Sequence, residues 1–197
     1  EVVLPSSMTY LPSSFFSGCK TLTSVTLPES LLSIGSNAFY NCSSLVLDSL
    51  PEGLTTLGDN VFYGCTSLQE MKIPSTAFEI GSYIFKGCTS LKKCSLPENL
   101  SSIPSGMFSS TDSLETVVIP QKVQFINSDA FRASGIKTLQ LPEGVTYIGT
   151  SAFAYSDIET INWPSALTTI NSEAFRGCEK LRSADYDVSK ITSFGDY

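Results

Sequence analysis

The residues that could do chemistry in this chain are cysteines and carboxylates, because its 197 residues include no histidine. That absence excludes Ser-His and Cys-His nucleophile pairs and the usual companion of cysteine in zinc sites. Paired carboxylates remain, and the candidates each follow a regularly spaced proline: Glu29, Glu52, Glu98 and Glu143. Pro-Glu is typical of an exposed turn, so we expect solvated glutamates, with a weak divalent-cation site as the alternative. We predict no enzyme and no cofactor.

The six cysteines allow two interpretations. Four of them recur at steps of 23 residues, at Cys19, Cys42, Cys65 and Cys88. One interpretation is a ladder of disulfides or metal ligands. The other is a row of stacked thiols that all point inward and behave as small hydrophobic groups. We favour the second and predict six free thiols and no metal site, with Cys94 in another buried row and Cys178 lacking a cysteine one repeat before it.

The elements that position these residues are set by a repeat that spans the chain. Prolines recur at steps of 23 residues five times and then 22 twice, at Pro5, Pro28, Pro51, Pro74, Pro97, Pro120, Pro142 and Pro164. Eleven residues after each one stands a phenylalanine: Phe16, Phe39, Phe62, Phe85, Phe108, Phe131, Phe153 and Phe175. Self-similarity at this period predicts a solenoid. Positions are counted below from the repeat proline, so that Phe39 is at +11.

One repeat gives the expected shape of a single coil, here called a rung. Residues 22–28 alternate apolar and polar side chains, which predicts a half-buried strand that the proline ends. Position +8 holds Ser, Thr or Asp in every repeat, all good helix N-caps, and Ala38, Phe39 and Cys42 follow at helical spacing. Left-handed residues that could end this turn are Gly18, Asn41, Gly64, Gly87 and Gly177. We therefore predict a strand, a bend, a short helical turn and a bend back.

Stacking turns these rungs into one domain, because a single rung cannot bury its own apolar side. We predict one solenoid domain over residues 1–197, roughly 40 Å long at the spacing of paired strands. Its rungs begin near residues 1, 22, 45, 68, 91, 114, 136 and 158, with a partial ninth from 181 that includes Tyr186, Ile191 and Phe194. Neither end carries a polar cap, so we expect adjoining domains of a longer parent protein.

The motif Leu-x-x-Val-x-Leu-Pro-x-x-Leu-x-x-Ile-Gly-x-x-Ala-Phe-x-x-Cys, read from Leu22 to Cys42, resembles the BspA-like leucine-rich repeat. The resemblance implies an α/β fold: a right-handed leucine-rich-repeat solenoid of about eight and a half rungs, with a parallel β-sheet on its concave face and short helical turns on its convex face. It also implies a cell-surface or secreted protein of a host-associated microbe that adheres to host or microbial protein or glycan. The family has no catalytic motif to carry over.

Two departures from the motif stand out. Thr111, Ser134 and Ser156 occupy the cysteine position or lie next to it in three of the later repeats. Asp48 falls on the inward strand position that Val25 or Met71 fills elsewhere, where a buried carboxylate would be costly. Either Asp48 is buried and hydrogen-bonded, or a local bulge lets Leu47 take its place.

Composition narrows the partners. The chain is 42% hydrophobic and 16% charged, with a net charge of -7, which excludes an acidic disordered tail and disfavours nucleic acid. No apolar run is long enough to span a membrane, so we expect no direct membrane insertion. The N-terminus carries no targeting signal, and we expect the sequence to be a fragment.

The candidate binding residues are outward-facing side chains that depart from the repeat. A possible basic patch for an acidic partner consists of Lys72, Lys92 and Lys93. Aromatic pairs on adjacent rungs are Phe125 with Tyr147 and, on the convex side, Tyr40 with Tyr63. Each pair is either a binding anchor or simply packs along the solenoid or against a neighbouring domain. We therefore predict a non-catalytic module whose strand face binds a protein or glycan macromolecule, with a structural spacer as the main alternative and an intracellular scaffold as the third.

Overall fold

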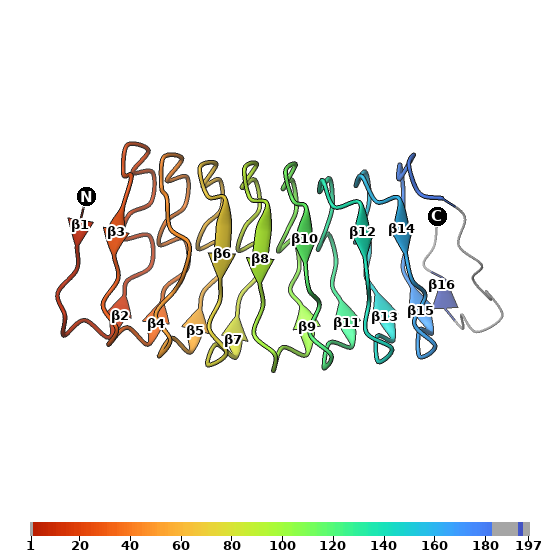
Figure 1. The fold of residues 1–197 in the computed structure, drawn as a ribbon, viewed down its shortest axis with the longest axis horizontal. Coiled ribbons are helices and arrows are strands. Elements are labelled where there is room, and N and C mark those ends of the chain that lie inside the picture. The colour runs from red at the N-terminus through yellow and green to blue at the C-terminus, as the bar shows by residue number, and fades with distance from the viewer. Residues whose placement is uncertain (1, 183–192, 195–197) are drawn as a thin grey trace.

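All repeats but the third contribute two short strands, whereas the sequence predicted one. The computed structural model describes residues 2–182 and 193–194, and they form a parallel β-solenoid of about seven turns (Figure 1). The strands before the prolines form what we call the pre-proline wall: β1 (Val2–Val3), β3 (Val25–Thr26), β6 (Glu70–Lys72), β8 (Lys93–Ser95), β10 (Thr116–Val117), β12 (Thr138–Leu139) and β14 (Thr160–Ile161). The strands after them form the post-proline wall: β2 (Tyr10–Leu11), β4 (Ser33–Ile34), β5 (Thr56–Leu57), β7 (Glu79–Ile80), β9 (Ser102–Ile103), β11 (Phe125–Ile126), β13 (Tyr147–Ile148), β15 (Thr169–Ile170) and β16 (Ser193–Phe194).

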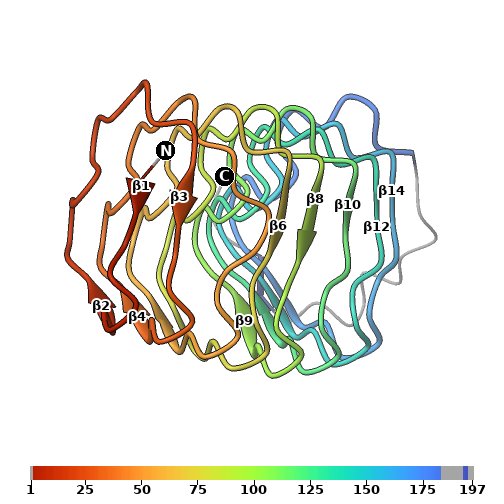
Figure 2. The ribbon, with the colours of Figure 1, turned by 60° about the vertical axis from the view of Figure 1, so that its left-hand side comes forward.

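Within each sheet, neighbouring strands pair in parallel and in register, so that equivalent residues of successive repeats lie side by side (Figure 2). The pre-proline wall consists of three sheets, β1-β3, β6-β8-β10 and β12-β14. The post-proline wall consists of two sheets, β2-β4-β5-β7 and β9-β11-β13-β15-β16. The break between them has a covalent cause. Gly58 and Gly81 each donate their N–H to the rung before, at 2.9 and 2.8 Å, whereas the equivalent Pro104 has no N–H to donate.

The third side of each rung, here called the turn wall, differs from the predicted helical turn. No helix occurs in residues 2–182 or 193–194. Backbone N–H groups there donate alternately within the rung and to the next rung; Ser17 donates to Ser14 at 3.0 Å, whereas Phe16 donates to Ala38 at 2.8 Å. The cause is that two residues of every turn, at +9 and +13, have positive φ, which turns alternate N–H groups along the solenoid axis. The residues at +8, which were expected to cap a helix, therefore stand at the start of these turns instead.

The core is a ladder of phenylalanine rings enclosed by the three walls. From Phe16 to Phe175, successive rings stack in parallel with centroids 5.1–5.9 Å apart. The six rings from Phe39 to Phe153 are fully buried. Aliphatic rows from both walls surround the ladder, and the inward residues of the post-proline wall include Leu11, Ile34 and Ile126. The predicted core rows are therefore confirmed.

The third repeat resolves the question of Asp48. Asp48 is exposed and accepts a hydrogen bond from the Ser49 hydroxyl at 2.9 Å, while Leu47 is partly buried against the core. Regular pairing of the pre-proline wall is lost there, and only an isolated bridge joins Ser49 to Lys72. Asp48 is therefore not buried, and the neighbouring Leu47 packs against the core instead; the register is kept, because Ser49 and Lys72 both stand two residues before their prolines.

The predicted ninth rung lies largely outside the described residues. Tyr186 and Ile191 belong to the stretch 183–192, of which nothing is described. Within β16, Phe194 pairs with Ile170 and continues the post-proline wall. The count of eight and a half rungs and the single-domain boundary remain predictions. No helix among the residues described is both long and apolar enough to cross a membrane.

Candidate binding surfaces

The predicted basic patch is interleaved with carboxylates. Lys72 on β6 forms an ion pair with Glu52 at 2.5 Å, and both side chains are exposed. Lys93 on β8 lies directly opposite Glu70 in the parallel pairing. Lys92 is also exposed and precedes β8. Both Lys72 and Lys93 thus have an acidic neighbour on the same face.

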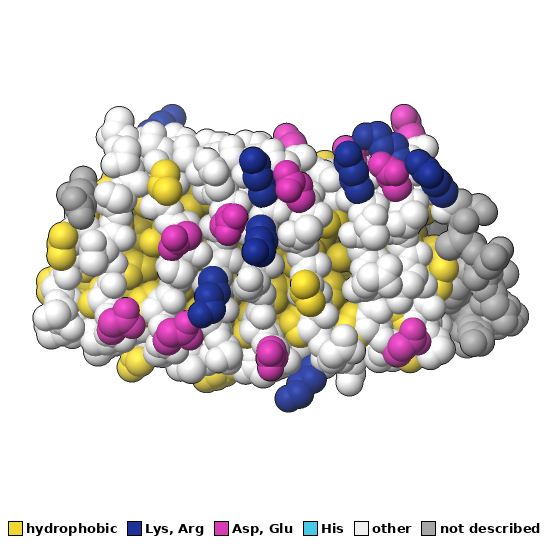
Figure 3. Space-filling model, viewed as in Figure 1, with side chains coloured by type: hydrophobic (Ala, Val, Ile, Leu, Met, Phe, Trp, Pro, Cys, Tyr) yellow, Lys and Arg dark blue, Asp and Glu magenta, His cyan; other side chains and the backbone are white. Residues whose placement is uncertain are grey.

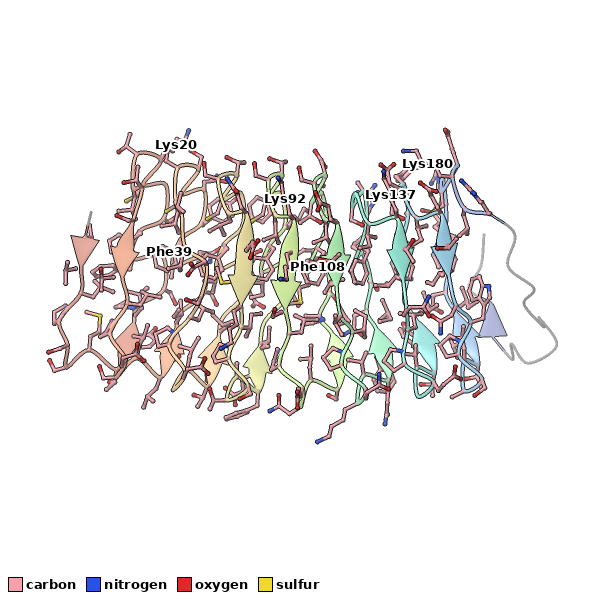
Figure 4. All side chains as sticks on the ribbon, viewed as in Figure 1. Lys20, Phe39, Lys92, Phe108, Lys137 and Lys180 are labelled. Atoms are coloured by element: carbon pink, nitrogen blue, oxygen red, sulfur yellow. The ribbon has the colours of Figure 1, made fainter. Side chains whose placement is uncertain are left out.

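Charges of alternating sign continue along the same side of the solenoid. One position per repeat, just before the pre-proline wall, holds in order Lys92, Glu115, Lys137, Glu159 and Arg182, whose backbones lie on successive rungs. Arg182 and Glu159 form an ion pair at 3.3 Å. Basic and acidic side chains accordingly intermingle over this face (Figure 3), and Lys20, Lys92, Lys137 and Lys180 lie toward its upper edge (Figure 4). This face therefore has no uniform charge that would attract a partner of one sign.

A shallow groove of about 220 Å³ crosses the pre-proline wall between β8 and β10. Val118 lines it with 80% of its side chain exposed, next to Pro120 and Leu96. Lys93 and Glu98 also line the groove, so an apolar centre is flanked by one charge of each sign. Val118 was not predicted as a binding residue, although the other residues two positions before the repeat prolines are mostly polar.

The aromatic pair on the post-proline wall is brought together as predicted. Phe125 on β11 and Tyr147 on β13 are aligned in register, with ring centroids 6.2 Å apart and ring planes tilted by 57°. Phe125 is 42% exposed, while Tyr147 is half-buried and its hydroxyl accepts a hydrogen bond from the Asn171 amide at 2.6 Å. Phe78, in the loop before β7, is 64% exposed and was missed, although its row otherwise holds mainly Thr, Ser and Gln.

A second aromatic cluster lies on the turn wall. The rings of Tyr40 and Tyr63 stack with centroids 4.7 Å apart and planes at 19°. Lys86 follows them on the next rung, with its ammonium 5.7 Å from the centroid of Tyr63 and 5.2 Å from that of Tyr83. Lys86 and Tyr83 were not predicted as site residues. Their place beside the two tyrosines becomes evident only when equivalent positions of successive rungs are compared.

All six cysteines carry free thiols, as predicted. Cys42, Cys65 and Cys88 are fully buried, and each thiol donates to the carbonyl of the phenylalanine one rung before at 3.0 Å. Burial away from water raises the pKa of Cys42 to about 11 and that of Cys88 to about 12. These protonated, buried thiols are poor nucleophiles at neutral pH.

Two of the four glutamates that follow repeat prolines contact groups other than carboxylates. Glu52 binds Lys72, and Glu143 accepts a hydrogen bond from the Ser165 N–H at 2.8 Å. Across residues 2–182 and 193–194, no three side chains of Cys, Asp or Glu are arranged to hold a metal ion.

Comparisons with known proteins agree with the repeat. A family model described as BspA type leucine-rich repeat region, with six copies of the repeat, matches residues 1–109 and 101–197. A leucine-rich repeat protein of T. pallidum is 30% identical with a TM-score of 0.78, over 88% of this chain and 82% of that one. A leucine-rich cell surface protein of Faecalibacterium prausnitzii A2-165 is 27% identical with a TM-score of 0.74, over 91% of this chain.

The chain spans only part of some of these relatives. It covers 61% of the F. prausnitzii structure and 59% of a leucine-rich repeat protein of Bacteroides ovatus, which is 23% identical with a TM-score of 0.72 and shows the fold alone. No curated protein matches the sequence.

Proposed function

Because the chain belongs to the BspA-type leucine-rich repeat family, we propose that it is a non-catalytic binding module of a bacterial surface protein and that its ligand is a macromolecule. The similarity to a leucine-rich cell surface protein of F. prausnitzii supports a surface location. The broad, nearly flat walls of the solenoid favour a large partner over a small metabolite, which would need a deep pocket.

The groove between β8 and β10 is the observation that carries this proposal. Val118, which directly follows β10, is 80% exposed there and lines the groove together with Leu96 and Pro120, so the groove has an apolar centre. An apolar anchor surrounded by polar groups is typical of the centre of a protein interface. Lys93 and Glu98 flank it and offer one ion-pair partner of each sign.

We propose a protein as the partner on this wall. The charges around the groove alternate, so a polymer of one sign would meet as many repulsive as attractive groups. A polypeptide segment that carries an apolar side chain between opposite charges would match both the groove and its rim. The same alternation argues against our sequence-based hypothesis of a lysine patch for an acidic partner.

An array of purified extracellular-matrix proteins, read by biolayer interferometry, tests this proposal. We expect the unmodified chain to bind at least one protein of the array, and Val118→Asp to weaken that binding at least tenfold, because it buries a carboxylate in the interface. The matched control is Val3→Asp, since Val3 occupies the same strand row, is 69% exposed and lies at the far end of the wall.

Two outcomes would contradict the proposal. If both aspartate variants bind as the unmodified chain does, the groove is not the binding site. If no protein of the array is captured, the alternative of a spacer without its own ligand is supported.

A further inference from the structure

Three repeats place an interacting pair at positions +9 and +12 of the turn wall, and one of them lacks the acidic member. Arg132 pairs with Asp129 at 3.6 Å, and Arg176 pairs with Glu173 at 2.9 Å. In the repeat of Pro74, the cation at +12 is Lys86, but the residue at +9 is Tyr83. The carboxylate that neutralises the other two cations is therefore replaced by an uncharged ring.

Lys86 has no ion-pair partner among the residues described. Its ammonium instead lies over the rings of Tyr63 and Tyr83, and its side chain is half-buried. Cation–π contacts hold the ammonium in place but leave its positive charge uncompensated. This is a pre-positioned cation that can accept an external anion.

Beside this lysine, glycines replace larger residues at three positions of the turn wall. Gly64 and Gly87 occupy the +13 position of their turns with positive φ. Gly106, at +9 of the next repeat, lies under the ring of Tyr83, where a Cβ atom would come within 2.0 Å of the ring. Asn41 likewise covers Gly64, where a Cβ atom would lie 2.2 Å from its Oδ1, whereas a Cβ atom on Gly87 would meet no atom nearer than 3.7 Å, so space for a ligand beside Lys86 lies at Gly87.

Tyr40 lies at the end of the tyrosine cluster, and one face of its ring has no aromatic partner among the described residues. Tyr63 stacks on one face of Tyr40, and the next rung on the other side presents Ser17 and Gly18, which are both exposed and small. Tyr40 itself is half-buried, and the ring face toward Ser17 and Gly18 is a surface on which a sugar ring can stack its C–H face; three tyrosine hydroxyls lie within the same cluster.

The turns of the first four repeats also differ in charge from the rest of the molecule. Residues 12–21, 35–44, 58–67 and 81–90 contain two lysines, Lys20 and Lys86, and one acid, Asp59, which gives +2 − 1 = +1. The whole chain carries -7. The remaining polar side chains of these turns are Ser, Thr, Asn and Tyr, which form hydrogen bonds without charge.

From these observations we propose that the turn wall of the first four repeats binds a polysaccharide that carries carboxylates but no sulfates. Lys86 binds a sugar carboxylate, Tyr40 stacks against a neighbouring pyranose, and hydroxyl and amide side chains of adjacent rungs bind sugar hydroxyls. Because rungs recur every ~4.8 Å, a polymer with repeating units can meet equivalent groups in turn. This inference extends the proposed binding function to a second wall and a second class of ligand.

The small number of lysines on the turn wall favours one kind of polyanion over the others. Nucleic acids and sulfated glycans bind through many charges at once, and two lysines on this wall, three rungs and therefore roughly 14 Å apart, cannot match that density. A glycan with one carboxylate per disaccharide has a comparable, sparse charge. An acidic peptide would satisfy Lys86 but would leave the aromatic face and the row of neutral hydrogen-bonding groups unused.

Isothermal titration with hyaluronan decasaccharide, whose glucuronates alternate with a neutral sugar, tests the proposal. We expect Lys86→Gln to weaken binding at least tenfold and Tyr40→Ala to weaken it by a similar factor. Lys86→Arg should retain binding, because it keeps the cation. The matched control is Lys92→Gln, which makes the same change of charge outside the turn wall and should leave the affinity unchanged.

Three results would overturn the proposal: no binding of the decasaccharide by the unmodified chain, equal affinities of Lys86→Gln and Lys92→Gln, or tighter binding of poly-glutamate than of hyaluronan. An uncharged chitin hexasaccharide should bind at least tenfold more weakly than hyaluronan, and equal binding would remove the role of the carboxylate. Val118→Asp separates this proposal from the protein-binding one, because it should leave hyaluronan binding intact while abolishing protein capture.

Discussion

Phe85 lies in the middle of the ring ladder, stacked between Phe62 at 5.8 Å and Phe108 at 5.9 Å, and is fully buried. We expect Phe85→Ala to lower the free energy of unfolding by about 3–5 kcal/mol, because rungs held by backbone hydrogen bonds on three sides cannot close over the cavity. Phe125→Ala, on the outer face of the post-proline wall, should lower the free energy of unfolding by less than about 1 kcal/mol. Urea denaturation of both variants measures the difference, and equal losses would contradict the assignment of the rows.

The buried thiols predict how stability depends on pH. In the folded chain the pKa of Cys42 is raised to about 11 and that of Cys88 to about 12, mainly because burial disfavours the thiolate, and the pKa of Cys65 is also raised. Above the ordinary value of 9.0, the unfolded chain releases these protons and the folded chain retains them. The free energy of unfolding should therefore fall as pH rises from about 9 toward 11.

A variant with Cys42, Cys65 and Cys88 replaced by serine isolates this effect. Serine does not titrate there, and hydroxyl residues already occupy this row in other repeats, as Thr111 does. All other ionisable groups are common to both proteins, so their effects cancel in the comparison. Thermal unfolding at pH 7, 9 and 10.5 should show a shallower decline for the triple variant, and parallel declines would disprove a contribution from the thiols.

At the scale of the element, the walls require a very close approach of successive rungs just after the second strand. A Cβ atom on Gly58 would lie 2.5 Å from the backbone nitrogen of Ser36 and 2.7 Å from its hydroxyl. We expect Gly58→Ala to destabilise the protein by about 1–3 kcal/mol, because the backbone of the preceding rung must move. The matched change Gly144→Ala meets no atom within 4 Å and should alter stability by no more than about 0.5 kcal/mol. Comparable losses in chemical denaturation would show that stacking at Gly58 tolerates a side chain.

The turn wall also shows that contacts between rungs can override the sequence signals of a helix. Serine at +8 and apolar residues at helical spacing satisfy the usual signals of a helix, yet the left-handed residues at +9, such as Asn37 and Tyr83, interrupt it. A non-glycine residue with positive φ is unfavourable by itself. Here hydrogen bonds to the next rung compensate, since Asn37 donates its N–H to Asp59 at 2.8 Å. Only the stacked molecule provides that acceptor.

At the scale of the whole molecule, the three walls divide the surface into faces with different charge patterns. Opposite charges alternate from rung to rung beside the pre-proline wall, while the turns of the first four repeats carry a small positive charge on an acidic chain. The same fold can therefore present a protein-binding groove on one side and a sugar-binding surface on another. Stacking fixes the inward residues, whereas outward residues remain free to vary with the partner.

The sequence alone determined the repeat, the solenoid, the phenylalanine core and the free thiols. Their signals are local or periodic, because every rung must bury the same side chains against its neighbours. It also predicted the contacts of Tyr40 with Tyr63 and of Phe125 with Tyr147, because in-register stacking places equivalent positions side by side. Asp48 could be identified as a conflict, but not resolved.

The tertiary structure alone decided how hydrogen bonds are shared and which charges are paired. The second strand of each rung and the loss of the helical turns depend on N–H groups that find acceptors one rung away. Likewise, Lys72 has a carboxylate partner and Lys86 has none among the described residues, although both lysines follow a buried apolar residue in the sequence. Ion pairing depends on distances of a few ångströms between side chains about 20 residues apart, and only the stacking of rungs sets those distances.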